Sequence, residues 1–143
     1  MKSPGSRRAR SRVYAGAIIL AWALGTTSCS TTGPDAMLES VVQDLISSGR
    51  AAETGLMIDA AGGMLPGSLT TLLSDMSREI SASITELELA PADEGDALYR
   101  ADALTAARGT LEAVRLAQYG HTSAAIEELD TWLAELSGLE DEQ

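Results

Sequence analysis

The chain has 143 residues, and its 21 acidic residues outnumber its ten basic ones, so the formal net charge at pH 7 is −11. Such an acidic surface repels nucleic-acid phosphates and anionic lipid headgroups, which argues against nucleic-acid binding and against electrostatic docking on membranes. One cysteine excludes an intrachain disulfide, and one histidine excludes the paired Glu-x-x-His motifs of di-metal helical bundles.

Residues 1–28 have the three parts of a secretory leader. Five basic residues occupy the start, an apolar stretch covers 13–24, and small residues follow it. A membrane-spanning helix needs about 20 residues, so this apolar stretch is too short for a permanent span. We therefore predict that residues 1–28 are a removable export signal.

Cys29 is the only cysteine, and it follows the apolar leader directly. This arrangement resembles the lipobox of bacterial lipoproteins, although Thr26 and Thr27 stand where that family usually has Leu and Ala or Ser. The resemblance implies that Cys29 is acylated and that the lipid holds the chain on the outer face of the cytoplasmic membrane or elsewhere in the cell envelope. The alternative is ordinary signal cleavage after Ala23, which leaves Cys29 as a free thiol.

Removal of the leader changes the charge of the chain. From Cys29 onward five basic residues, all arginine, remain against 21 acidic ones, which gives a net charge of −16. Residues 29–35 are expected to form a short lipidated tether, 36–138 a single domain, and 139–143 an acidic tail. With no phenylalanine in the chain, the domain must build its core from Leu, Ile, Val, Ala and Met.

The first half of the domain has the pattern of two helices. Apolar residues from Met37 to Ile46 recur on one helical face, and Gly49 is a plausible stop for that helix. A weaker helix is expected over 50–61, with Gly55 interrupting it. Glycines and a proline then break the chain over 62–67.

The second half has a clearer helical pattern. A helix over 68–90 carries an apolar seam of alternating three- and four-residue steps, of the kind that packs helices nearly antiparallel. A helix over 96–119 has a broad alanine-rich surface, which indicates contacts on more than one side. The last helix covers 122–138, with Gly138 as its stop. The predicted fold class is all-α, an antiparallel bundle of four to five helices.

The last two helices carry Gly120 followed by Ala124, Ala125, Ile126, Leu129 and Leu133. This pattern faintly resembles the helical hairpin of tetratricopeptide-type repeats. A solenoid needs about three stacked units and the sequence has one hairpin, so no function follows from it.

The sequence lacks the residue sets of common catalytic sites. His121 lies at a predicted turn with no nucleophile motif beside it. An EF-hand loop beginning at Asp93 would need a glutamate at its twelfth position, which is Leu104. No phosphate-binding glycine loop occurs. We therefore expect no enzymatic activity, no cofactor and no metal.

Two groups of residues are candidate contact sites. Three arginines eight and seven residues apart on one helix could receive an anionic group or carboxylates of a partner: Arg100, Arg108 and Arg115. An ordinary surface ion-pair ladder through Glu112 is the alternative. The second group lies in an apolar, glycine-broken segment and could bind an apolar ligand or a partner: Met57, Ile58, Met64 and Leu65. Its alternative role is to plug the core.

These patterns favour a membrane-tethered envelope lipoprotein that acts as a non-catalytic interaction or accessory module for an envelope protein partner. The competing hypothesis is a carrier or sensor that holds a small apolar ligand inside the bundle. In that hypothesis Met57, Ile58, Met64 and Leu65 form a movable wall.

Overall fold

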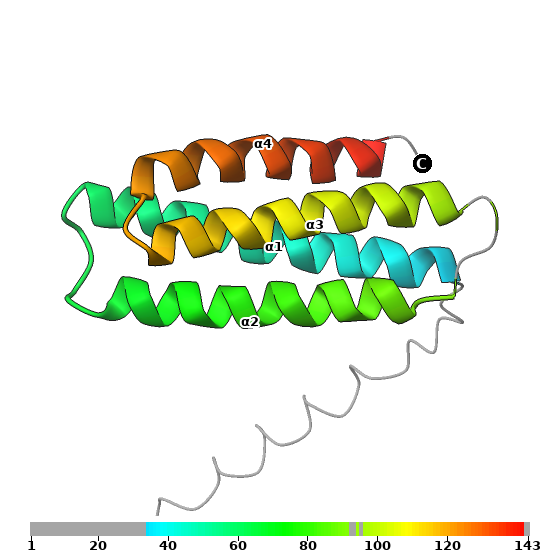
Figure 1. Cartoon of the computed structure of the whole chain (residues 1–143), viewed down its shortest axis with the longest axis horizontal. Helices are drawn as coiled ribbons and strands as arrows, with labels where there is room; N and C mark the ends of the chain where they lie inside the picture. Colours follow the sequence, from blue (N-terminus) through cyan, green and yellow to red (C-terminus); the bar gives the residue numbers. More distant parts are fainter. Residues whose placement is uncertain (1–33, 92–93, 95, 142–143) are drawn as a thin grey trace, which may run out of the picture. The chain divides into compact units, whose positions relative to one another are not determined.

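The protein is described by a computed structural model that covers residues 34–91, 94 and 96–141. These residues form α1 (Pro34–Ala60), α2 (Ser68–Leu89), α3 (Asp96–Gln118) and α4 (Thr122–Asp141). The helices run antiparallel in chain order (Figure 1). The all-α bundle is thus confirmed, with four helices in the described residues. The leader and Cys29 lie outside the described residues.

The first helix differs from the prediction. α1 runs unbroken for 27 residues through Gly49 and Gly55. Both glycines lie where another helix approaches: a Cβ at Gly49 would stand 2.6 Å from Leu133 Cδ2, and one at Gly55 would overlap the Leu72 side chain. The predicted stop at Gly49 is therefore wrong, because these glycines admit neighbouring helices and do not end their own.

The core is a single cluster of aliphatic side chains contributed by all four helices. The predicted apolar face of α2 is confirmed: Leu73, Ile80, Ile84 and Leu87 are buried, and Leu69 and Met76 pack partly buried against the core. The largest fully buried aliphatic side chains of the other helices are Leu38, Val42, Leu45, Leu56, Val114, Leu129 and Leu136. An aliphatic core of this kind packs well without aromatic residues.

The third helix, like the first, contacts every other helix of the bundle. α3 contacts α4, α2 and α1, which confirms the predicted contacts on more than one side. Small buried residues allow this close approach: Ala103, Ala106, Ala107, Thr110, Ala113 and Ala117. Leu98 is 75% exposed, because it lies near the start of the helix where no neighbour covers it.

Glycines were predicted to end both α3 and α4, and the prediction is right for one of them. α3 ends at Gln118, Gly120 in the turn after it has φ 88°, and His121 N–H donates to the Leu116 carbonyl at 3.0 Å. This six-to-one bond is typical of the Schellman motif and confirms the predicted turn role of His121. The predicted stop at Gly138 is wrong: α4 continues to Asp141, because a single glycine tolerates helical backbone.

The antiparallel order gives the bundle two different ends (Figure 1). The start of α1, the α2–α3 connection and the end of α4 share one end, which we call the terminal pole. The α1–α2 connection at 61–67 and the α3–α4 turn at 119–121 share the other end, which we call the turn pole.

Candidate functional site

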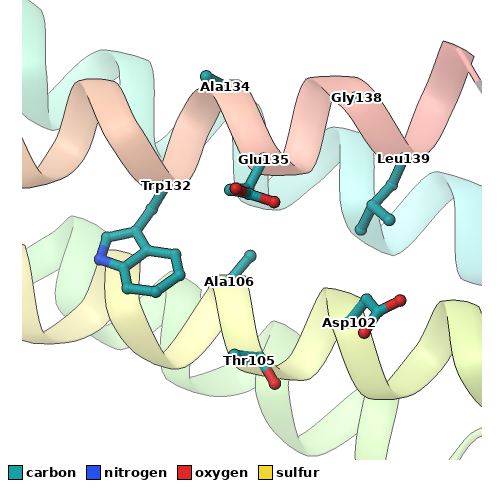
Figure 2. A pocket seen from close by; sticks show the side chains of 8 residues that line it. All are labelled: Asp102, Thr105, Ala106, Trp132, Ala134, Glu135, Gly138 and Leu139. Carbon is teal, nitrogen blue, oxygen red and sulfur yellow. The ribbon is translucent and has the colours of Figure 1, made fainter.

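A groove of about 490 Å³ lies between α3 and α4. It is lined by Asp102, Thr105 and Ala106 from α3 and by Trp132, Ala134, Glu135, Gly138 and Leu139 from α4 (Figure 2). We call it the α3–α4 groove. Its volume falls within the range of ligand pockets, about 300–1,000 Å³.

The groove is a gap between two large side chains over a floor of small ones. Trp132 and Leu139 both extend from α4 toward α3 (Figure 2). They are seven residues apart, which is about 10.5 Å along a helix. Between them, Ala106 contributes only a methyl group and Gly138 no side chain. The hollow therefore exists because small residues stand where larger ones would fill it.

The Trp132 ring packs closely against the facing helix at a glycine. A Cβ added at Gly109 would overlap the indole ring and stand 2.6 Å from Nε1. The indole thus lies directly on the α3 backbone and is only partly buried. Because this contact restricts the ring, one wall of the groove is positioned before any ligand arrives.

The groove is acidic and its carboxylates lack cationic partners. Asp102 and Glu135 line it and are both exposed. Three ion pairs occur in the described part of the bundle, and all lie elsewhere: Arg78–Asp75 at 3.2 Å, Arg108–Glu88 at 2.8 Å and Arg115–Glu112 at 2.6 Å. The two groove carboxylates are therefore available to a cation from outside the chain.

The lining of the groove provides contacts for a bound group. The groove's hydroxyl, that of Thr105, donates to the Ala101 carbonyl of its own helix at 3.0 Å. What the groove offers is apolar surface, an indole ring and two carboxylates, which together can hold an aliphatic stem with a cationic head. No protein-family model, curated protein or solved structure matches the chain.

The three arginines singled out in the sequence do not meet at one site. Arg100 Nη1 donates to the Ala90 carbonyl at 2.7 Å, across the α2–α3 connection. Arg108 pairs with Glu88 of α2, and Arg115 pairs with Glu112 of its own helix. Each arginine thus has its own partner inside the bundle, and Glu112 serves only one of them.

The apolar group singled out in the sequence lies at the turn pole. Met57, Ile58 and Leu65 are 48%, 44% and 77% exposed, and Met64 is half-buried. They lie around the α1–α2 connection, where Gly63 N–H donates to the Ile58 carbonyl at 2.9 Å. This position suits an exposed contact surface better than the wall of an interior cavity.

A second polar feature lies at the terminal pole. The Tyr99 hydroxyl and Glu140 Oε1 are buried, and neither has a hydrogen-bond partner among the described residues. Burial raises the pKa of Tyr99 above 10.0, and the negative charges of Glu140 and Glu39 raise it further. A tyrosine with a raised pKa is harder to ionise, so this feature does not supply a base at neutral pH.

The described residues also bear on metal binding and membrane insertion. Among them, no group of three or more His, Cys, Asp or Glu side chains is placed to hold a metal ion. None of the described helices combines the length and the apolar character that crossing a membrane requires.

Proposed function

We propose that the protein is a lipid-anchored envelope protein that acts as a non-catalytic binding module, and that a partner protein docks in its α3–α4 groove. One observation carries the proposal. The groove combines a preset indole ring with two carboxylates that no cation of the described bundle neutralises. Aromatic residues are enriched at protein interfaces, and an unpaired carboxylate can pair with a cation that a partner brings.

The leader supports the anchored part of the proposal. Each buried methylene of a lipid chain contributes about 0.8 kcal/mol, so two or more chains on Cys29 would hold the protein stably. Only four residues separate Cys29 from the start of α1 at Pro34. Such a short tether keeps the bundle near the bilayer, where partners in the envelope are accessible.

The packing favours a surface contact over an internal ligand. Large side chains from all four helices fill the interior, and Leu45, Leu56 and Ile80 have no exposed area. The residues expected to form a movable wall are at the turn pole and mostly exposed. The α3–α4 groove lies between two helices at the surface, where a partner can reach it. A carrier of an apolar ligand is therefore the less supported hypothesis.

The anchor is tested with Cys29→Ala in the full chain. We expect the variant to leave the membrane fraction or to accumulate as an uncleaved precursor. Fractionation followed by intact-mass measurement distinguishes these results from normal processing. Unchanged membrane retention together with normal processing would refute acylation of Cys29.

The groove is tested by photo-crosslinking in intact cells. A photoreactive amino acid at Thr105 or Ala134 should capture a defined envelope protein, identified by mass spectrometry. Ala82, exposed on α2 and outside the groove, is the matched control position. Capture of the same protein equally well from position 82, or no capture from positions 105 and 134, would contradict the proposal.

A further inference from the structure

The lining of the α3–α4 groove indicates which side chain a partner inserts there. We infer that the groove receives an arginine from a helix of the partner protein, an inference that rests on the proposed function. Three properties of the groove lead to this choice: its shape, its charge and its indole ring.

The shape fits a long side chain approaching from a helix. The gap between Trp132 and Leu139 extends over about two helical turns, and Ala106 and Gly138 are small residues of its lining. An arginine stem of three methylenes lies along such a lining. The remaining volume accepts small apolar neighbours one turn away on the incoming helix, as in helix-in-groove recognition.

The charge selects a cation. Asp102 and Glu135 come from facing helices, one on each side of the gap, and the ion pairs of the described bundle leave both of them free (Figure 2). A guanidinium has five donors and can satisfy carboxylates on two sides, which an ammonium does less well. The net charge of −16 from Cys29 onward steers a basic helix toward the bundle.

The indole ring favours arginine over lysine. A planar guanidinium stacks on an aromatic face and is less strongly hydrated than an ammonium. The contact between Trp132 and Gly109 already restricts this ring, so binding loses little side-chain freedom there. Arginine is also the charged residue most enriched at the centre of protein interfaces.

The test uses Trp132 as its own reporter, because it is the only tryptophan from Cys29 onward. Residues from Thr32 onward form a compact unit, and the buried core of its described residues comes from α1 to α4. We therefore expect the fragment 30–143 to fold without the leader, and circular dichroism checks this before the titration. It is titrated with an alanine- and leucine-faced helical peptide bearing one central arginine, and with versions bearing lysine or the neutral isostere citrulline.

We expect the arginine peptide to change Trp132 emission and to bind about tenfold more tightly than the citrulline peptide, with the lysine peptide between them. The double variant Asp102→Asn/Glu135→Gln should abolish most of this preference. The matched control Asp59→Asn/Glu86→Gln removes the same charge from exposed positions of α1 and α2 and should retain it. Circular dichroism verifies that each variant is folded.

Several outcomes would overturn the inference. Equal affinity for the arginine and citrulline peptides would show that the groove does not recognise the positive charge of the side chain. If the groove variant and the control variant lost the preference for the arginine peptide equally, the preference would come from the overall negative charge and not from the groove. If free argininamide bound with the same affinity as the arginine peptide, the occupant would be a small cation and not a helix. If position 105 still captured a partner in cells after any of these results, the proposed function would stand and only the arginine would be refuted.

Discussion

Gly109 and Gly138 both lie inside helices, yet their surroundings are opposite. A Cβ at Gly109 would overlap the Trp132 ring, whereas a Cβ at Gly138 would meet no atom within 4 Å. An alanine normally stabilises a helix interior by about 1 kcal/mol relative to glycine. An alanine at Gly138 therefore tests the effect of helix propensity on stability, and an alanine at Gly109 tests the effect of packing.

We predict that Gly109→Ala lowers the free energy of unfolding by about 1–3 kcal/mol, because the rigid indole must move away from α3. Gly138→Ala should raise it by up to about 1 kcal/mol. Urea denaturation of both variants measures the difference. Adding Trp132→Leu should remove most of the Gly109→Ala penalty, and stabilisation by both alanines would contradict the contact.

Tyr99 leads to a prediction about alkaline pH. Its pKa is raised in the folded state by burial and then by the charges of Glu140 on α4 and Glu39 on α1. Above pH 10, the tyrosine's ordinary pKa, the unfolded chain loses this proton first, so stability falls as pH rises toward the folded pKa. The free energy of unfolding should therefore fall more steeply above about pH 10 in the wild type than in Tyr99→Phe.

The control for this measurement is Tyr119→Phe, which removes a tyrosine that is 81% exposed. It should keep the steep alkaline fall of the wild type. At neutral pH Tyr99→Phe should be neutral or slightly stabilising, because the hydroxyl has no hydrogen-bond partner to lose. A marked loss of stability at neutral pH would mean that the hydroxyl has a partner in solution.

The four helices could be predicted well where local signals and packing agree. α2 has both a regular apolar seam and clear flanking residues, and its burial follows the prediction. At Gly49 the local signal favours a stop, but the contacts with Leu133 and Thr110 require a small residue inside a continuous helix. Periodicity reports which face of a helix is buried, but not how closely the neighbouring helix approaches.

The α3–α4 groove could not be predicted for the same reason. It depends on Gly109 and Trp132, which are 23 residues apart and meet only through packing. Its carboxylates are two among 21 acidic residues, and only the folded bundle shows that Asp102 and Glu135 line one groove away from the three ion pairs. The sequence signals that pointed to the groove were Trp132, the only tryptophan from Cys29 onward, and Gly109 inside a predicted helix.

The continuity of α1 can be tested by amide hydrogen exchange. If the helix passes through Gly49, the amides of residues 50–53 have helical partners and should be about as protected as those of 41–46. A helix starting anew after Gly49 would leave its first four amides without partners. Fast exchange at 50–53, comparable to that of Met64 and Leu65 in the connection after α1, would contradict the continuous helix.

At the scale of the whole molecule, charge opposes folding. The chain from Cys29 has a net charge of −16, and the three ion pairs of the described bundle are exposed. Exposed pairs contribute about 0–1 kcal/mol each, so they offset little of the repulsion among the remaining carboxylates. Salt should therefore stabilise the folded state more by screening this repulsion than it destabilises the folded state by screening the attractive pairs.

We predict that Tm of the fragment 30–143 rises by several degrees when NaCl increases from about 0.01 M to about 0.15 M, where the Debye length shortens from about 30 Å to about 8 Å. A gain of 1 kcal/mol corresponds to roughly 4 °C in a domain of this size. Thermal melts followed by circular dichroism give the measurement. The Asp59→Asn/Glu86→Gln variant should show a smaller rise, and a fall in Tm with salt would mean that attraction dominates.

The start of α1 and the end of α4 share the terminal pole (Figure 1). Such a chain is suited to circular permutation, because a short linker can join its ends and a new opening can be made at the exposed Gly62–Gly63. In a permuted protein the proposed lipidation signal would precede residue 63, and a lipid attached there would turn the turn pole toward the bilayer. The same bundle could thus be attached to a membrane in either orientation, which would show whether a partner approaches the groove from the membrane side or from above.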